Sequence, residues 1–322
     1  MPSSLIARKE LKKRKRRRMS KMSEFVWGTV MVVYLFLGGL AGGSYTVGAL
    51  ADLLNKKEYR PFTKAGILSS FVSIVLGLVM LVLDLKRFEV APVGILHVYT
   101  RFPDSIMSVG TWLITAFTVV SLFTTLLWFL DGDALIRKIV EVIGIVLGLG
   151  TAAYTGILLS FARGVPVWQS GFLPWLFVLS GLLTGMAFSI LVIPIAGILM
   201  PRAFGDFKTM WDSKMRFAGL IGYTDRYAQS IIVVETVVML LYFVTTPSTS
   251  ILWWGSGVSV YFYAYLLLAL AAPLAIVLYN QRQHQEEKHE TVIYLSMLAI
   301  IFALMGGYLL RYVVLMGGQM LH

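Results

Sequence analysis

Residues 25–50, FVWGTVMVVYLFLGGLAGGSYTVGAL, form a continuous run without a single charged side chain. A helix of about 20 apolar residues crosses the hydrocarbon core of a bilayer, so this run is long enough to span it. The run is also too long for the apolar part of a secretory signal and lacks a small-residue cleavage pattern. It therefore predicts a transmembrane helix that is retained as a membrane anchor.

The composition of the whole chain agrees with this first run. Hydrophobic residues make up 57% of the 322 residues, charged residues make up 14%, and the mean hydropathy is +0.77. Such a chain has too little polar surface for a water-soluble globular protein, and its apolar surface must face lipid. We predict an all-α integral membrane protein of the plasma membrane, multi-pass, with about eight transmembrane helices. The expected spans are residues 25–50, 65–85, 106–130, 138–161, 172–200, 228–246, 257–280 and 291–316.

An even number of spans places both termini on one side of the membrane, which we name face A; the opposite side is face B. The expected parts are a basic tail (1–24), a first four-helix bundle holding the functional site (25–163) and a second four-helix bundle (164–322). Residues 36–43 and 178–185 align without a gap, and both spans start on face A, which is typical of a parallel repeat. Glycines spaced for close helix packing explain the same pattern without a repeat.

The positive charges leave the orientation open. Ten of the 28 Lys and Arg residues lie between Arg8 and Lys21, and we expect this tail to bind anionic lipid headgroups rather than nucleic acid. The face B loops carry 13 Lys and Arg, and face A carries five outside the tail. Lys and Arg concentrate on the cytoplasmic side, so face A is inside for the full chain. It is outside if translation starts at Met19 or Met22.

Several polar and aromatic residues are expected to share a layer below face A. At about 1.5 Å per residue, Tyr34 lies about 13 Å and Tyr154 about 10 Å below this face. Asp84 ends the second span, Trp112 begins the third, and His97 lies in the connection between them. These groups could hydrogen-bond the two oxygens of a quinone and exchange its protons. Equally, Tyr and Trp near helix ends are ordinary interfacial residues, and Asp84 is then a charge at a helix end.

Charged residues inside the spans are the second set of candidates. Glu235 lies within the apolar run 231–238, where an unpaired carboxylate is costly, so a functional role is expected. Asp52 and Glu141 are expected near the same face B, where the three carboxyl groups either form a proton path or cap helix ends. Arg311 lies about five residues from the face A end of the last span, so we expect its side chain to reach the interface.

The residues that are missing restrict the redox chemistry. The protein has no cysteine, so it cannot hold an iron–sulfur cluster by thiolates. A membrane haem needs axial histidines within the spans, and all four histidines fall in expected loops or at the terminus. They are His97, His284, His289 and His322. No glycine-rich phosphate loop precedes a helix. We therefore expect no haem and no iron–sulfur cluster in this chain, and any such centre belongs to a partner subunit.

Six separated motifs carry a family resemblance. They are LFLGGLAGG (35–43), LDLKR (83–87), RFPDSIMSVGTW (101–112), YTGILL (154–159), PVW (166–168) and LRYVVLMGGQ (310–319). By these motifs the sequence, from about residue 25 to 319, resembles the NrfD-type family. The members of this family are the membrane subunits of polysulfide reductase and of related molybdopterin or iron–sulfur oxidoreductases.

The resemblance implies a haem-free subunit that binds a quinone such as menaquinone, or its quinol, in the first bundle near face A. It further implies electron transport in anaerobic respiration, with an iron–sulfur ferredoxin-like subunit docked on face A and a molybdopterin-type catalytic subunit beyond it. Tyr154 matches the quinone-contacting tyrosine of the family, and Tyr34 stands where the polysulfide reductase subunit has histidine. We expect the docking face to include Arg101, Arg163, Trp168 and Arg311.

Two other functions remain open at this point. The protein could be a proton- or ion-translocating subunit that uses Asp52, Glu141 and Glu235, or a passive anchor without quinone binding. In each case the terminal catalytic centre lies outside this chain.

Overall fold

The computed structural model describes residues 28–54, 59–84, 97–161, 165–246, 257–285 and 288–320. These residues contain no strand, and they include eight helices that are long and apolar enough to cross a membrane. The prediction of an all-α membrane protein with about eight spans is confirmed. The chain is a multi-pass membrane protein.

Seven of the spans are single α-helices, and the remaining one is built from three segments. The single helices are α2 (Thr29–Leu53), α3 (Arg60–Asp84), α5 (Ile106–Phe129), α6 (Ala134–Ser160), α7 (Leu173–Leu199), α9 (Lys214–Thr245) and α13 (His289–Met320). The composite span joins α11 (Ser259–Tyr265), the π-helical segment η4 (Leu266–Ala271) and α12 (Ala272–Gln285). Short helices α4 (His97–Thr100), η3 (Pro166–Trp168) and α8 (Gly205–Asp212) lie between spans.

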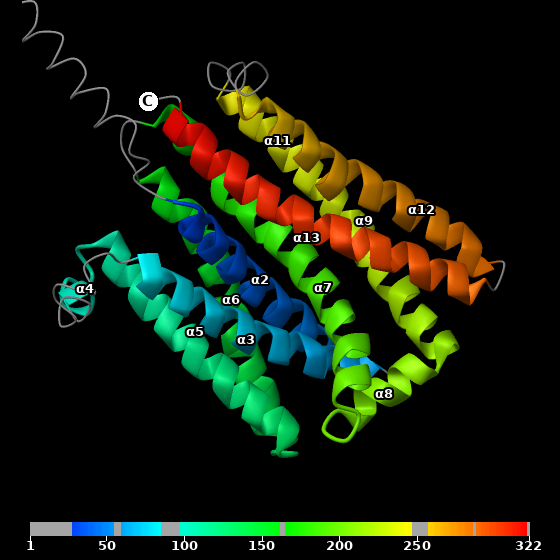
Figure 1. Ribbon diagram of the computed structural model, residues 1–322. Helices are drawn as coiled ribbons and strands as arrows, with labels where there is room; N and C mark the ends of the chain where they lie inside the picture. The colour runs from blue at the N-terminus through cyan, green and yellow to red at the C-terminus, as the bar shows by residue number, and fades with distance from the viewer. Residues whose placement is uncertain are drawn as a thin grey trace, which may run out of the picture.

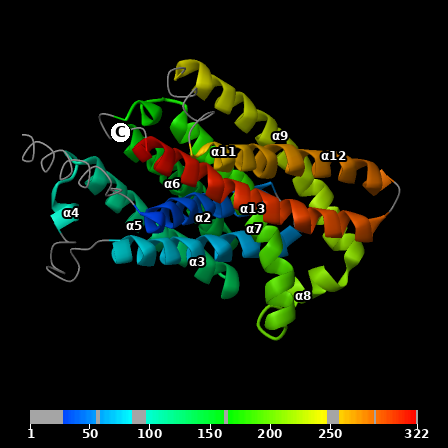
Figure 2. The same cartoon turned by 45° about the horizontal axis from the view of Figure 1, so that its top comes forward.

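The spans form two groups that meet along α2 and α7. In the first helix group, α2 packs against α3 and α6, and α5 contacts both of these. In the second helix group, α7, α9, α12 and α13 pack on one another. Helix α2 (blue) of the first group and helix α7 (green) of the second lie side by side where the two groups meet (Figure 1, Figure 2). The predicted bundle boundary at 163/164 lies outside the described residues, so the division into two domains stays a prediction.

Glycines make the contact between α2 and α7. A Cβ atom added to Gly43 would overlap the carbonyl oxygen of Gly181, and one added to Gly185 would overlap the backbone of Ser44. A Cβ atom on Gly181 would lie 2.7 Å from the carbonyl oxygen of Gly39. These glycines belong to the two stretches that align in the sequence, 36–43 and 178–185. The similar pattern therefore occurs on the two surfaces that touch each other.

One span boundary was predicted wrongly, and it changes the position of Glu235. The expected loop 201–226 contains α8 and the first turns of α9, which begins at Lys214 and not near 228. Charged residues at 214, 216, 225 and 226 interrupt the apolar run and conceal these turns. Since α9 ends at Thr245, Glu235 lies about 15 Å from its face A end and not near face B.

The glycine contact can be tested with Gly43→Ala. We expect this variant to lose about 1–3 kcal/mol of stability, because overpacking forces two backbones apart. Thermal unfolding of the purified protein in detergent would measure the effect. The matched control is Gly171→Ala, because no atom lies within 4 Å of a Cβ atom at that position. Equal melting temperatures for both variants would show that the α2–α7 contact is not tight.

Candidate functional site

Tyr34 and Tyr154 meet between the helices of the first group, in its face A half. Their side chains are buried, and the two phenols are close enough to interact electrostatically. Helix α5 leaves room for the Tyr154 ring at Gly110, because a Cβ atom there would overlap the ring. On α3, Gly77 lies beside Tyr34, and a Cβ atom added there would make an ordinary contact with Tyr34 Cδ2 at 3.9 Å. Two of the five predicted quinone-site residues are therefore together.

Trp112 lies elsewhere on α5. It follows Gly110 by two residues, which is about 200° around a helix, so it faces away from Tyr154. Its side chain is 49% exposed, and its Nε1 atom donates a hydrogen bond to the backbone oxygen of Tyr99 at 3.3 Å. The Tyr99 ring contacts the indole edge-on at 5.4 Å between centroids. The structure thus places Trp112 against α4 and does not bring it to the two tyrosines.

Asp84 and His97 can be located only by their backbones. Asp84 ends α3 and His97 begins α4, so both lie on face A as predicted. Their side chains are outside the described part of the protein, and their roles in the site stay predictions.

A charged cluster joins α2, α5 and α6 toward face B. Arg137 lies between two carboxylates: its Nη2 atom is 3.4 Å from Asp52 Oδ2, and its Nε atom is 3.8 Å from Glu141 Oε1. Its guanidinium group also stacks 4.0 Å from the centroid of the Trp128 ring, and Trp128 Nε1 donates to Glu141 Oε1 at 2.8 Å. The structure thus brings Asp52 and Glu141 together as predicted, through an arginine that the sequence analysis did not single out.

Glu235 does not belong to this cluster. It lies on α9, which packs against α7, α12 and α13 in the second group. Its side chain is fully buried, and Tyr265 donates its hydroxyl hydrogen to Glu235 Oε1 at 3.1 Å. Arg311 lies close enough to interact with Glu235 electrostatically. The expected path through Asp52, Glu141 and Glu235 is therefore wrong, because the third residue lies in another helix group.

Arg311 is buried and does not reach the membrane interface, so the expectation of a snorkelling side chain on the docking face is wrong. Its exposed fraction is 0%. Nη1 donates to Ser180 Oγ at 2.8 Å and to the Gly307 carbonyl at 2.7 Å, and Nη2 donates to the Phe177 carbonyl at 3.2 Å. The physical reason is that these oxygens and Glu235 replace water around the guanidinium group.

Of the other predicted docking residues, one is exposed, one is buried and one lies outside the described part of the protein. Arg101 is exposed just before α5 on face A, where a partner could contact it. Trp168 is buried, packs against Gly318 and donates from Nε1 to the Val314 carbonyl at 2.8 Å, so it joins η3 to α13. The expectation of a docking role for Trp168 is wrong for this reason. Arg163 lies outside the described residues.

The architecture is that of a multi-pass helical membrane protein. It has a buried pair of phenols under one face and buried ionisable groups in its core. The sequence matches the family described as polysulphide reductase, NrfD, over residues 18–322. The chain belongs to this family.

Three curated relatives illustrate the range of the family. The protein is 31% identical over 188 residues to a polysulfide reductase component of Wolinella succinogenes, and this match covers 52% of its own length and 58% of the relative. It is 27% identical to an NrfD homolog of Haemophilus influenzae over 54% of its own length and 61% of the relative. It is 22% identical to a selenate reductase component of Mesobacillus selenatarsenatis over 63% of its own length and 54% of the relative. The matches thus span less than two thirds of each relative.

The buried position of Arg311 can be tested with Arg311→Met. We expect a loss of about 3–5 kcal/mol, because three buried oxygen acceptors lose the charged group that donates to them. Thermal unfolding in detergent would measure it. The control Arg282→Met changes an exposed arginine and should leave the melting temperature within about 2 °C. Equal effects of both arginine changes would contradict the structural role of Arg311.

Proposed function

We propose that this protein is the quinone- or quinol-binding membrane subunit of an oxidoreductase complex. The observation that carries the proposal is the buried pair Tyr34 and Tyr154 in the face A half of the first helix group. Among the described residues, neither phenolic oxygen has a hydrogen-bond partner. Both hydroxyl groups are therefore available to a ligand that carries oxygen atoms.

The chemistry of the pair suits a quinone. A phenolic hydroxyl donates to a quinone carbonyl and accepts from a quinol hydroxyl, so the same contact serves either direction of the reaction. Oxidation of one quinol releases two electrons and two protons. An iron–sulfur cluster of the partner would accept these electrons one at a time, while Tyr154 and Tyr34 would hydrogen-bond the quinol oxygens, whose protons would pass to water at face A. A menaquinone tail would lie against the apolar side chains of the spans.

The proposed partners follow from what this protein lacks and from its relatives. Without cysteine it cannot hold a thiolate cluster, so electrons need a cluster on another subunit. Tyr34 and Tyr154 lie within about 13 Å of face A by helix rise, which favours docking of an iron–sulfur ferredoxin-like subunit on that face. Relatives are named as components of polysulfide and selenate reductases. We propose a molybdopterin-type catalytic subunit beyond the iron–sulfur protein, in a plasma membrane complex.

The first test of this function is Tyr154→Phe. Removing one hydroxyl group should weaken binding of a quinol analogue about tenfold, the value of one hydrogen bond of roughly 1.4 kcal/mol. Quenching of tryptophan fluorescence in the purified protein would measure the dissociation constant. Tyr294→Phe is the matched control, because Tyr294 is 74% exposed on α13. Its affinity should stay unchanged.

A second variant tests the site without removing a hydroxyl group. Gly110→Ala should displace the Tyr154 ring and weaken analogue binding. The control Gly150→Ala should leave binding unchanged, because the nearest atom to its Cβ is Leu113 Cδ1 at 3.4 Å. Absence of saturable binding in the unaltered protein would overturn the proposal and favour a passive anchor. Equal affinity in all the variants would remove Tyr154 from the site.

A further inference from the structure

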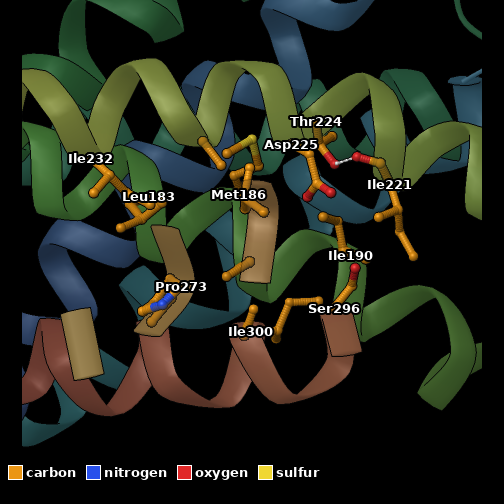
Figure 3. A pocket seen from close by; sticks show the side chains of 15 residues that line it. Leu183, Met186, Ile190, Ile221, Thr224, Asp225, Ile232, Pro273, Ser296 and Ile300 are labelled. Carbon is orange, nitrogen blue, oxygen red and sulfur yellow. Dashed lines mark hydrogen bonds between the residues drawn. The ribbon is translucent and has the colours of Figure 1, made fainter. Parts of the chain in front are cut away.

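A half-open cavity lies between the helices of the second helix group, and neither Tyr34 nor Tyr154 lines it. Its volume is about 40 Å³, and its walls come from α7, α9, α12 and α13 (Figure 3). Most of the lining side chains are apolar, such as Leu183 and Ile300. The exceptions gather at one end, where Asp225 on α9, with Thr224 beside it, faces Ser296 on α13 (Figure 3).

The wall formed by α9 connects two buried carboxyl groups. Asp225, Ala228 and Ile232 line the cavity, and Glu235 follows one turn after Ile232. These four residues are spaced by three, four and three positions, so they share one face of the helix. Asp225 is 7% exposed and Glu235 is fully buried. The two carboxyl groups are about 15 Å apart along the helix, with the cavity between them.

Helix α13 forms a matching wall on the opposite side. Ser296, Ile300 and Ala303 line the cavity, and Gly307 and Arg311 continue the same face toward face A. Each of the two helices therefore carries a polar residue on either side of the cavity. Asp225 and Ser296 mark the face B end, and Glu235 and Arg311 mark the other.

The face B end is held by a buried amide. Asn280 on α12 is fully buried; its Nδ2 atom donates to Ser296 Oγ at 2.8 Å and lies 3.4 Å from Asp225 Oδ2. Its Oδ1 atom has no hydrogen-bond partner in the described structure. Beside this end, Gln281 Nε2 on α12 donates to Gln229 Oε1 on α9 at 2.8 Å.

The Glu235 end also has unused hydrogen-bonding capacity. Tyr265 occupies Glu235 Oε1, whereas Glu235 Oε2 and Arg311 Nε are buried without a partner in the described residues. Buried polar atoms of this kind are usually satisfied by water. The π-helical segment η4 begins directly after Tyr265, and such segments are frequent at functional sites.

We propose that the second helix group carries a proton-transfer path in which Asp225 and Glu235 are the two proton-holding groups and the cavity holds the water between them. A proton leaves the Asp225 carboxyl group for a cavity water, and a proton passes from the water chain to Glu235 Oε2. Asp225 then receives a proton from water at face B. The class of ligand is water with its excess proton, and the step involves no electron transfer. It does not depend on quinone binding.

The size of the cavity fits this role. A buried water needs about 10–15 Å³ of such volume, so 40 Å³ admits about three water molecules. A chain of about three waters would extend over the greater part of the gap between the two residues. The alternative is a dry apolar cavity beside two structural carboxyl groups, because cavities lined by apolar side chains stay empty. These two cases predict different access of protons to Glu235.

Hydrogen–deuterium exchange of the carboxyl groups distinguishes them. The full chain in lipid vesicles is transferred from H₂O to D₂O, and infrared difference spectra follow the carbonyl stretch of protonated carboxyl groups. The band removed by Glu235→Gln belongs to Glu235. We expect Asp225→Asn and Ala228→Leu each to slow the deuteration of this band about tenfold or more, because the path then lacks a proton-holding group or its water.

Matched variants separate the path from general effects on the fold. Ala275→Leu adds the same side chain on α12 at a position exposed on the outside of the second group, and Asp212→Asn removes an exposed carboxyl group. Both should leave the deuteration rate of Glu235 unchanged. If Ala228→Leu does not fold, Ala299→Val narrows the same cavity from α13.

The proposal is overturned by either of two results. One is a Glu235 band that exchanges at an unchanged rate in Asp225→Asn and in the cavity-filling variant. The other is the absence of any protonated-carboxyl band that Glu235→Gln removes. Neither result bears on quinol-analogue binding by Tyr154, so the two proposals fail separately.

Discussion

The close approach of α2 and α7 is the constraint on which the rest of the molecule depends. Lipid is as apolar as the side chains, so helices in a bilayer associate through close packing and hydrogen bonds and not through the hydrophobic effect. Glycine at 43, 181 and 185 lets the two backbones touch where a Cβ atom would collide with the backbone of the other helix. This contact fixes the distance between the helix groups. Helices α3, α6 and α13 pack against both members of the pair, α9 packs against α7, and α5 and α12 pack on these surrounding helices.

Arg311 can be buried because of this contact. Its guanidinium group occupies the space over Gly39 that a side chain would fill, and it reaches oxygens of Phe177 and Ser180 on α7. Its guanidinium carbon is 5.8 Å from the ring of Phe36, which lies two residues after Tyr34 on α2. One side chain of the second group therefore touches the helix that carries the proposed quinone site, and the same side chain faces Glu235.

The sequence predicted the helices and the tyrosine pair well, because apolar length and helix rise are local properties. Tyr34 and Tyr154 were placed by counting 1.5 Å per residue from two helix ends. Prediction failed where charge occurs inside a span. Asp225 and Arg226 have the hydropathy of a loop, and Arg311 has that of a residue at a helix end. Helices α9 and α13 nevertheless continue through these positions, because other helices supply polar partners for Asp225 and Arg311. Such partners come from segments distant in the sequence, so no local pattern reveals them.

The two sets of buried carboxyl groups differ in their countercharges, and this difference suggests separate roles. Asp52 and Glu141 both lie within 4 Å of Arg137, and Trp128 stacks on its guanidinium group, so the arrangement ties α2, α5 and α6 together. Among the described residues, Asp225 and Glu235 have no ion pair within that distance; their hydrogen-bond partners are an amide and a phenol, and Arg311 acts on Glu235 electrostatically from further away. A carboxyl group fixed by an arginine cannot give up or accept a proton without breaking that pair. Asp225 has no such ion pair and lines the cavity, and Glu235 follows the cavity along the same face of α9, which is why the first cluster is assigned to structure and the second to proton transfer.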